Sequence, residues 1–292
     1  MIIHRERSDR TARSGTSPVS RPGVTNQLAI LEPDRSDPYV FDHPLDHVPG
    51  MYLLSGMLNT VRAIEPASPE RSGRRLTMSA EFLHFCELGE TIDLVSRQEL
   101  EHLPDTVISI QLRQRNRDVC TGRFGYQPAI SAEQARSNAD PAFDEPAAAE
   151  LVHRARPGNV MASRMVERNG DRLVAIRRPA AGHPLACGTR DAIRAEAVVD
   201  AARQFATMIC HEVHRQPMDT QFVLLGIDGE WPCGLRFPSY LRWAPTRPGR
   251  GRPRVELDIL AGDPGAKPAG RIAFDYFTAS PAAYRRIRAK EA

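Results

Sequence analysis

One stretch in the first half of the chain has the hydrophobic spacing of a helix. Residues 50–64 carry apolar side chains at Met51, Leu54, Leu58 and Val61, which is the pattern of a helix with a broad buried face. The stretch EPASPE that follows stops the helix, because proline cannot continue it. The sequence therefore predicts one long helix here, entered from a polar loop.

The stretches around this helix alternate between apolar and polar residues instead. The alternation is clearest in residues 105–115, where Ile108, Ile110 and Leu112 share one face, as in a strand with one side buried. Short turns separate the stretches, which favours an antiparallel meander. The strands expected in this half are residues 26–31, 75–85, 91–101, 105–115 and 118–127.

The second half repeats this order of elements. A hairpin is expected around Asn169-Gly170, a dipeptide that favours tight turns, and residues 191–214 carry the pattern of a long helix. Further strands and a short basic helix over residues 281–292 follow. The strands expected in this half are residues 159–167, 171–178, 220–228, 234–243, 253–261 and 269–278.

The repeated order predicts an α+β double hotdog fold. In each repeat a long central helix is wrapped by a curved antiparallel sheet, and two repeats in one chain replace a two-fold dimer. We expect a disordered tail over residues 1–24, a first repeat over 25–128, a linker over 129–150 and a second repeat over 151–292. Pairing of the halves within one chain and exchange between the chains of a homodimer both stay open.

The composition favours a soluble, cytoplasmic protein. With 41% hydrophobic and 26% charged residues the chain can bury a core, and no apolar run is long enough to span a membrane. A net charge of +3 without a concentrated basic face argues against nucleic-acid binding. Five cysteines without a CxxC pair fit reduced thiols. The polar N-terminus lacks the apolar region of a secretory signal, and an organelle transit peptide is the weaker alternative.

A polar loop ahead of the first helix is the first candidate site. It contains Asp42, His43, Asp46 and His47 and ends at Gly50, whose amide at a helix N-terminus can hold a developing negative charge. The alternative is that these side chains cap the helix and brace the loop. The DHxxDH spacing lacks a helical scaffold for metal ligands, and no nucleotide-binding fingerprint occurs, so we expect no metal and no cofactor.

Asp200 on the second helix is the candidate acid or base. Its neighbours in sequence are apolar, and a buried carboxylate resists ionisation and can transfer protons near neutral pH. Arg203 follows one turn later, where it can pair with Asp200 or hold a phosphate or enolate oxygen. The alternative is a structural ion pair without a catalytic role.

Several strings resemble the A-factor synthase family of γ-butyrolactone biosynthesis proteins. FDHPLDHVPGM at residues 41–51, with the helix after it, resembles one repeat of that family. The order of the two repeats is exchanged relative to the family. The strings that resemble the other repeat are VHR at 152–154, GHP at 182–184, DAARQ at 200–204, His211, Pro217 and QFVL at 221–224.

The resemblance implies an activity as well as a fold. Members of the family join a β-ketoacyl chain, delivered on acyl carrier protein, to the hydroxyl of dihydroxyacetone phosphate, toward a butenolide or γ-butyrolactone signal. The expected partners are therefore an acyl carrier protein or acyl-CoA thioester and a small hydroxylated acceptor. The family's helix carboxylate and following arginine are matched by Asp200 and Arg203, whereas the first repeat has Ser55 and Leu58 at those places.

The resemblance also selects the site residues. Hotdog dehydratases pair a loop histidine with a helix carboxylate, and by that analogy His43 and His183 join Asp200 and Arg203 as catalytic residues. Dehydration or hydrolysis of acyl thioesters is the alternative activity. A non-catalytic acyl-binding scaffold, favoured by Ser55, is the alternative outside enzymes. Substrate contacts are expected from Asp42, Asp46, His47, Gly50, Ser55 and Gln204.

Overall fold

Two helices and one continuous sheet form the body of the protein. The computed structural model describes residues 2–3, 25–43, 45–65, 73–99, 106–128, 139–187, 191–245 and 254–291. Almost all of the expected tail therefore lies outside the described residues. Helix α1 spans Gly50–Ile64, and helix α2 spans Ala195–Met208 and continues into a π-helical turn, η4, at Ile209–Val213. A C-terminal helix, α3, spans Pro281–Glu291.

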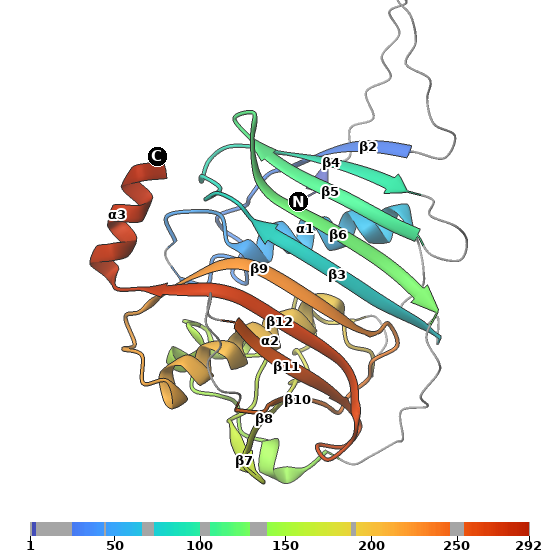
Figure 1. The fold of residues 1–292 in the computed structure, drawn as a ribbon, viewed down its shortest axis with the longest axis vertical. Coiled ribbons are helices and arrows are strands. Elements are labelled where there is room, and N and C mark those ends of the chain that lie inside the picture. Colours follow the sequence, from blue (N-terminus) through green and yellow to red (C-terminus); the bar gives the residue numbers. More distant parts are fainter. Residues whose placement is uncertain are drawn as a thin grey trace, which may run out of the picture.

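The strands join edge to edge in a single twelve-stranded antiparallel sheet (Figure 1). Their order is β1-β2-β4-β5-β6-β3-β9-β12-β11-β10-β8-β7. The strands are β1 (Ile2–Ile3), β2 (Thr25–Leu31), β3 (Arg74–Phe82), β4 (Ile92–Glu99), β5 (Thr106–Gln114), β6 (Arg117–Pro128), β7 (Val166–Arg168), β8 (Asp171–Ala175), β9 (Gln221–Pro232), β10 (Ser239–Trp243), β11 (Arg254–Ala261) and β12 (Pro268–Ala279).

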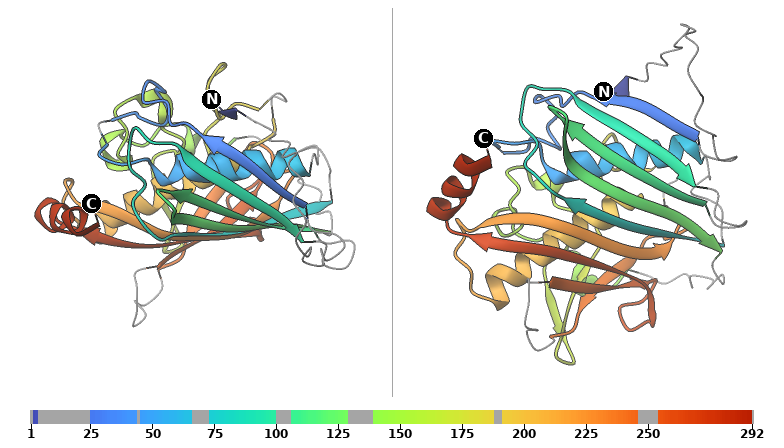
Figure 2. Two further views of the ribbon diagram at one scale, coloured as in Figure 1. Left: turned by 90° about the horizontal axis from the view of Figure 1, so that it is seen from above. Right: turned by 45° about the horizontal axis from the view of Figure 1, so that its top comes forward.

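The strand order is symmetric about the β3–β9 junction, so the chain is a double hotdog as predicted. Each half contributes β-strands in the same order outward from the junction, and each half contributes one long helix. Strands β3 and β9 pair from Arg75 opposite Pro232 to Glu81 opposite Gly226. Figure 2 shows α1 and α2 together on the concave face of the sheet. The two repeats therefore pair within one chain.

Helix α2 begins four residues later than its hydrophobic pattern suggested. Residues 191–194 form extended contacts instead: Ala192 bridges Arg236, and the Ile193 amide donates to the Leu235 carbonyl. The apolar spacing could not show this because Ile193 is buried in either conformation. None of the described helices is long and apolar enough to cross a membrane.

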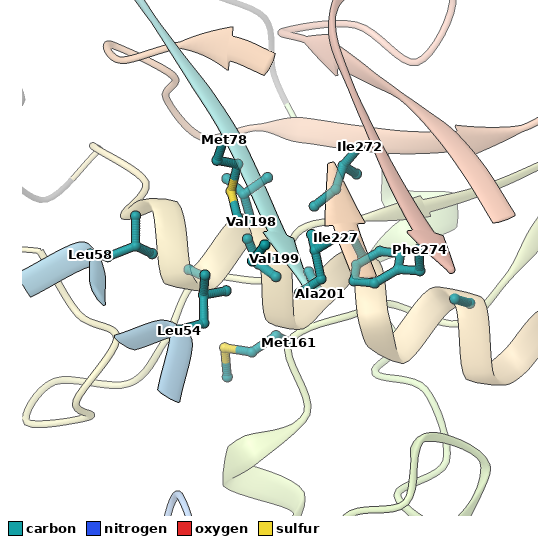
Figure 3. Close-up of a cluster of buried hydrophobic side chains, with 14 of the residues drawn as sticks. Leu54, Leu58, Met78, Met161, Val198, Val199, Ala201, Ile227, Ile272 and Phe274 are labelled. Carbon is teal, nitrogen blue, oxygen red and sulfur yellow. The ribbon is translucent and has the colours of Figure 1, made fainter. Parts of the chain in front are cut away.

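The core runs across the junction of the two halves. Leu54 and Leu58 of α1 are fully or almost fully buried against the strands and against α2, so neither helix has an apolar face left over. Figure 3 shows this part of the core, to which α1, α2, β3, β9 and β12 all contribute. Its labelled side chains are Leu54, Leu58, Met78, Met161, Val198, Val199, Ala201, Ile227, Ile272 and Phe274.

The stretch predicted to be a linker is described from residue 139 onward. There it forms two short 3-10 helices, η1 (Pro141–Phe143) and η2 (Glu150–Val152). The Phe143 ring packs edge-on against Tyr240 with ring centroids 5.0 Å apart, so this part belongs to the core of the second half. The exact limits of the repeats remain a prediction.

Gly270 in β12 offers a direct test of the packing. A Cβ atom at this position would lie 2.6 Å from the Cβ of Trp231, which is almost fully buried. We expect Gly270→Ala to lower the free energy of unfolding by about 1–3 kcal/mol, because the sheet must shift to relieve the clash. Gly158→Ala is the control: its new Cβ would meet no atom within 4 Å. Equal urea midpoints for the two variants would contradict this packing.

Candidate functional site

A cavity of about 320 Å³ opens where the two halves meet the C-terminal helix. Its walls come from the loop before α1, the end of α2, strands β9 and β12, and α3. The size is that of a small-molecule site. Most of the wall is apolar, and the apolar side chains include Met51, Leu53, Phe82, Leu224, Phe274 and Phe277.

The polar side chains that line this cavity include the imidazoles of His43 and His153 and two guanidiniums. His43 comes from the loop of the first half, and His153 and Arg154 follow η2 in the second half. Arg203 projects from α2. The cavity thus draws its polar groups from both repeats, which requires the halves to be paired.

Asp200 lies beneath these polar side chains and is fully buried. Its carboxylate accepts five hydrogen bonds at 2.8–3.1 Å: two from Arg154, two from Arg203 and one from the Gln204 amide. Burial favours the neutral acid, but the two guanidiniums outweigh burial and hold the pKa of Asp200 below its usual 3.8. The expectation that burial would suit Asp200 to proton transfer near neutral pH is therefore not met.

Arg154 makes the largest contribution to the low pKa of Asp200. Its Nη2 bonds Asp200, its Nη1 donates to the Tyr39 carbonyl at 3.0 Å, and its guanidinium stacks over the Tyr39 ring at 5.0 Å. Arg154 is buried, yet its pKa is raised: burial opposes the charge, and Asp200 more than compensates. A buried arginine was not among the expected site residues, although it lies in the VHR string.

His43 lines the cavity as an uncharged imidazole. Burial lowers the pKa of His43, and the nearby positive charges of Arg154 and Arg203 lower it further, with Asp42 acting in the opposite direction. Its Nδ1 atom is buried without a hydrogen-bond partner among the described residues. The loop histidine expected at this site therefore lies at the cavity wall.

Asp42 and Gln204 hold the backbone and side chains next to the cavity in place through hydrogen bonds. The Asp42 carboxylate accepts from the backbone amides of Ala155 and Arg156, at 3.1 Å each, so it fixes the segment after Arg154. It does not cap α1, which begins after Pro49 without a side-chain cap. The Gln204 amide donates to Asp200, and its oxygen accepts from the Met161 amide at 2.8 Å.

Asp46 and His47 anchor the C-terminal helix. Asp46 accepts from the Tyr284 hydroxyl at 2.8 Å and from Arg288, and it also bonds the His47 ring at 2.7 Å. Arg288 reaches Glu87 as well, and Tyr284 lines the cavity beside His47. These contacts hold α3 against the cavity. The loop residues were expected to brace the loop itself, whereas Asp46 and His47 contact the C-terminal helix.

The other expected residues differ in their access to the cavity. Gly50 lines it at the first turn of α1. Ser55 instead donates to the Met51 carbonyl of its own helix at 2.8 Å. His183 is not among the described residues that line the cavity, and both of its ring nitrogens are engaged, Nδ1 by the Leu185 amide and Nε2 by Asn159.

His153 is the site residue that the pattern of the sequence did not reveal. It lines the cavity, and its ring bonds His211 through the two Nε2 atoms, 2.9 Å apart. Burial, the nearby His211, and Arg203 and His43 lower the pKa of His153 to about 4. The VHR string was the only signal, because His211 lies 58 residues away and no spacing rule connects them.

The low pKa of His153 predicts a loss of stability in mild acid. Between about pH 6.5 and pH 4 the unfolded chain takes up a proton that the folded protein refuses, so stability falls as pH falls through this window. The full shift corresponds to at most about 3 kcal/mol. Urea midpoints measured at about pH 7 and pH 5 should differ less for His153→Asn than for the parent. Equal differences would contradict the assignment.

Comparison with known proteins agrees with the fold. The family model for the A-factor biosynthesis hotdog domain matches residues 135–240. A Streptomyces virginiae protein, 2-oxo-3-(phosphooxy)propyl 3-oxoalkanoate synthase, is 30% identical over 105 residues, which cover 30% of this chain and 35% of that protein. The chain thus matches about a third of the length of this relative. The resemblance to A-factor synthases is confirmed by these matches.

Similar solved structures extend the comparison to nearly the whole chain. The dehydratase domain from the CurF module of curacin polyketide synthase has a TM-score of 0.58 at 10% identity, covering 90% of this chain and 97% of its own. The dehydratase domain of RzxB from Pseudomonas fluorescens has a TM-score of 0.55 at 12% identity, covering 87% and 94%. At such low identities the likeness concerns the double hotdog fold alone.

Proposed function

We propose that this chain is an acyltransferase; the match of residues 135–240 to the family model for the A-factor biosynthesis hotdog domain supports this. It would join a β-ketoacyl chain, carried as a thioester on acyl carrier protein or CoA, to the hydroxyl of a small phosphorylated acceptor such as dihydroxyacetone phosphate. The observation that carries the proposal is the cavity, which combines apolar walls for an acyl chain with Arg154 and Arg203 for an anion. The name of the Streptomyces virginiae relative describes an ester of these two parts.

In this reaction the acceptor oxygen bonds the thioester carbonyl carbon, the C–S bond breaks, and the hydroxyl proton ends on the leaving thiolate. Direct attack needs no covalent enzyme intermediate, so holding both substrates in one cavity supplies much of the rate. The neutral His43 ring and the Gly50 amide, at the positive end of α1, suit the carbonyl oxygen as it becomes negative.

Arg203 suits the phosphate of the acceptor. Its Nε and Nη2 atoms bond Asp200, and its Nη1 has no hydrogen bond within the described part of the chain. A guanidinium held on one edge by a carboxylate presents its other edge in a fixed direction, which favours a phosphate oxygen. Asp200 acts here as the buried counter-ion that orients both arginines.

Dehydration of a hydroxyacyl thioester fits the site less well. That reaction needs an acid to protonate the departing hydroxyl, and Asp200 is ionised and has all its oxygens occupied. An open cavity lined by His43, Arg154 and Arg203 also argues against a scaffold that only fills space. Hydrolysis of the thioester would use the same groups, with water in place of the acceptor. Product analysis distinguishes hydrolysis from acyl transfer.

Product analysis by mass spectrometry tests the proposal. The protein is mixed with β-ketoacyl carrier-protein thioester, with and without dihydroxyacetone phosphate, and separately with a β-hydroxyacyl thioester. We expect an ester that requires the acceptor, and about a 100-fold slower reaction for His43→Asn. His214→Asn, an exposed histidine outside the cavity, should match the parent. Loss of the acyl group without acceptor, an unsaturated product, or unchanged thioesters throughout would each contradict acyl transfer.

A further inference from the structure

The reaction proposed above still needs a group that takes the acceptor's proton, and Asp200 is not available. The pair formed by His153 and His211 lies at the same cavity. His211 is carried by the π-helical turn η4, and its Nδ1 lies 2.9 Å from the Gln216 carbonyl oxygen. Its Nε2 lies 2.9 Å from Nε2 of His153, which lines the cavity wall.

These two contacts fix where the protons sit. A carbonyl oxygen can only accept, so Nδ1 of His211 carries a hydrogen, and neutral His211 then has a bare Nε2. The 2.9 Å contact therefore requires a hydrogen on Nε2 of His153. Neutral His153 is left with a bare Nδ1 atom, which is a proton acceptor. Charging of His153 in the resting protein is opposed by burial and by the nearby His211, Arg203 and His43, which lower its pKa.

The bare Nδ1 is available to a ligand. It has no hydrogen bond within the described residues, and it is also absent from the described buried polar atoms that lack a partner. It therefore keeps accessible surface, and His153 is one of the residues that line the cavity. The ring is held edge-on to Phe222 at a centroid distance of 5.3 Å, so its orientation is fixed from two sides.

His153 also has an unusual backbone conformation. The residue has φ 52° and ψ 51°, the left-handed region that residues other than glycine rarely occupy. Its neighbour Arg154 is locked onto Asp200, and the Arg154 amide donates to the Ala149 carbonyl at 2.8 Å. Strain of this kind persists where the surroundings enforce it, and it is commonly found at functional sites.

We propose that His153 is the catalytic base of the acyl transfer and that His211 is the positioning residue that fixes its tautomer; this rests on the proposed function. Nδ1 of His153 takes the hydroxyl proton as the acceptor oxygen bonds the carbonyl carbon, whose π electrons move to oxygen. The oxyanion then reforms the carbonyl, the C–S bond breaks, and the thiolate takes the proton from Nδ1. Throughout, Nε2–H of His153 donates to neutral His211. The groups that act electrostatically on His153 are the titratable rings of His211 from η4 and His43 from the first-half loop, and the charged Arg203 from α2.

Substitution tests the base. Asparagine tolerates the left-handed backbone, so His153→Asn removes the base without imposing new strain. We expect kcat for the alcohol acceptor to fall by about 10²–10⁴-fold. Hydroxylamine attacks a thioester as a neutral amine and needs no prior proton removal, so its acylation rate should be unchanged. Equal losses with both acceptors, or no loss with the alcohol, would overturn the proposal.

His211 provides the test of positioning. His211→Gln keeps an oxygen that can accept a hydrogen bond from His153, so this variant should retain most of the acyl-transfer activity. His211→Leu has no acceptor, so it should lose most of this activity and show a changed pH dependence of kcat. Equal activity of the two variants would overturn the positioning role.

A measurement of tautomers separates this inference from the proposed function. Nitrogen-15 correlation spectra of the histidine rings in the parent protein should show His153 protonated at Nε2 and bare at Nδ1. Ester formation together with the opposite tautomer would overturn the base and leave acyl transfer standing. Absence of ester formation in the parent would overturn both.

Discussion

Arg154→Met is expected to lower the free energy of unfolding by about 3–5 kcal/mol. Arg154 supplies two of the five hydrogen bonds to Asp200, whose side chain is completely buried. Methionine fills the space but leaves the carboxylate with Arg203 and Gln204 alone, and it abandons the Tyr39 carbonyl. Removing one partner of a buried charge costs more than the pair contributes as a whole. Urea unfolding followed by circular dichroism measures the effect as a lower midpoint at an unchanged slope.

A surface pair supplies the matched control. Arg168 pairs with Asp140 at 2.7 Å with its side chain 39% exposed, so Arg168→Met should cost less than about 1 kcal/mol. Combining Arg154→Met with Asp200→Asn should recover part of the loss, because it removes the uncompensated charge. If Arg154→Met cost no more than Arg168→Met, the buried pair of Arg154 and Asp200 would not contribute to stability as argued.

The long helices and most strands could be predicted because each leaves a local trace in the sequence. The strand predicted over residues 159–167 was wrong in extent, because β7 spans only Val166–Arg168 and Pro157–Asn159 forms a 3-10 helix. Residues 105–115 alternate in polarity, and β5 occupies Thr106–Gln114. The spacing around Leu54 reports one face of a helix, and α1 spans the predicted range. Symmetry of the element order then gave the double hotdog arrangement. The spacing of hydrophobic residues involves only neighbours within a few positions, so it can be recognised without knowing the tertiary contacts of the chain.

The charge state of Asp200 could not be predicted in the same way. Its apolar neighbours in sequence suggested a raised pKa, and burial does act in that direction. Two charges oppose burial: Arg203, one turn away on the same helix, which the sequence did place next to Asp200, and the larger contribution of Arg154, 46 residues earlier, which only folding brings to the carboxylate. The partnership of His153 with His211, and of Asp46 with Arg288 across 242 residues, is equally invisible to local patterns. Site chemistry here depends on long-range contacts, whereas the scaffold depends on short-range ones.

Arg203→Met is expected to remove the preference for a phosphorylated acceptor. A charge-assisted hydrogen bond contributes about 1.5–3 kcal/mol, which corresponds to about 10- to 100-fold in kcat/KM. Dihydroxyacetone phosphate should lose this factor, while unphosphorylated dihydroxyacetone should react as slowly with the variant as with the parent. Steady-state ester formation with the two acceptors measures the ratio. Arg203→Lys keeps the charge without the planar fork and should fall between parent and Met variant.

Arg62 is the matched control for this effect. It also lies on a central helix and pairs with a buried carboxylate, Glu196, but it is not among the described residues that line the cavity. Arg62→Met should therefore alter stability and leave the acceptor ratio unchanged. A change in the ratio for both variants would show that loss of any helix arginine perturbs the cavity. If the acceptor ratio changed in neither variant, the phosphate would bind away from Arg203. A guanidinium that contacts the phosphate in a largely apolar cavity cannot be removed without weakening binding.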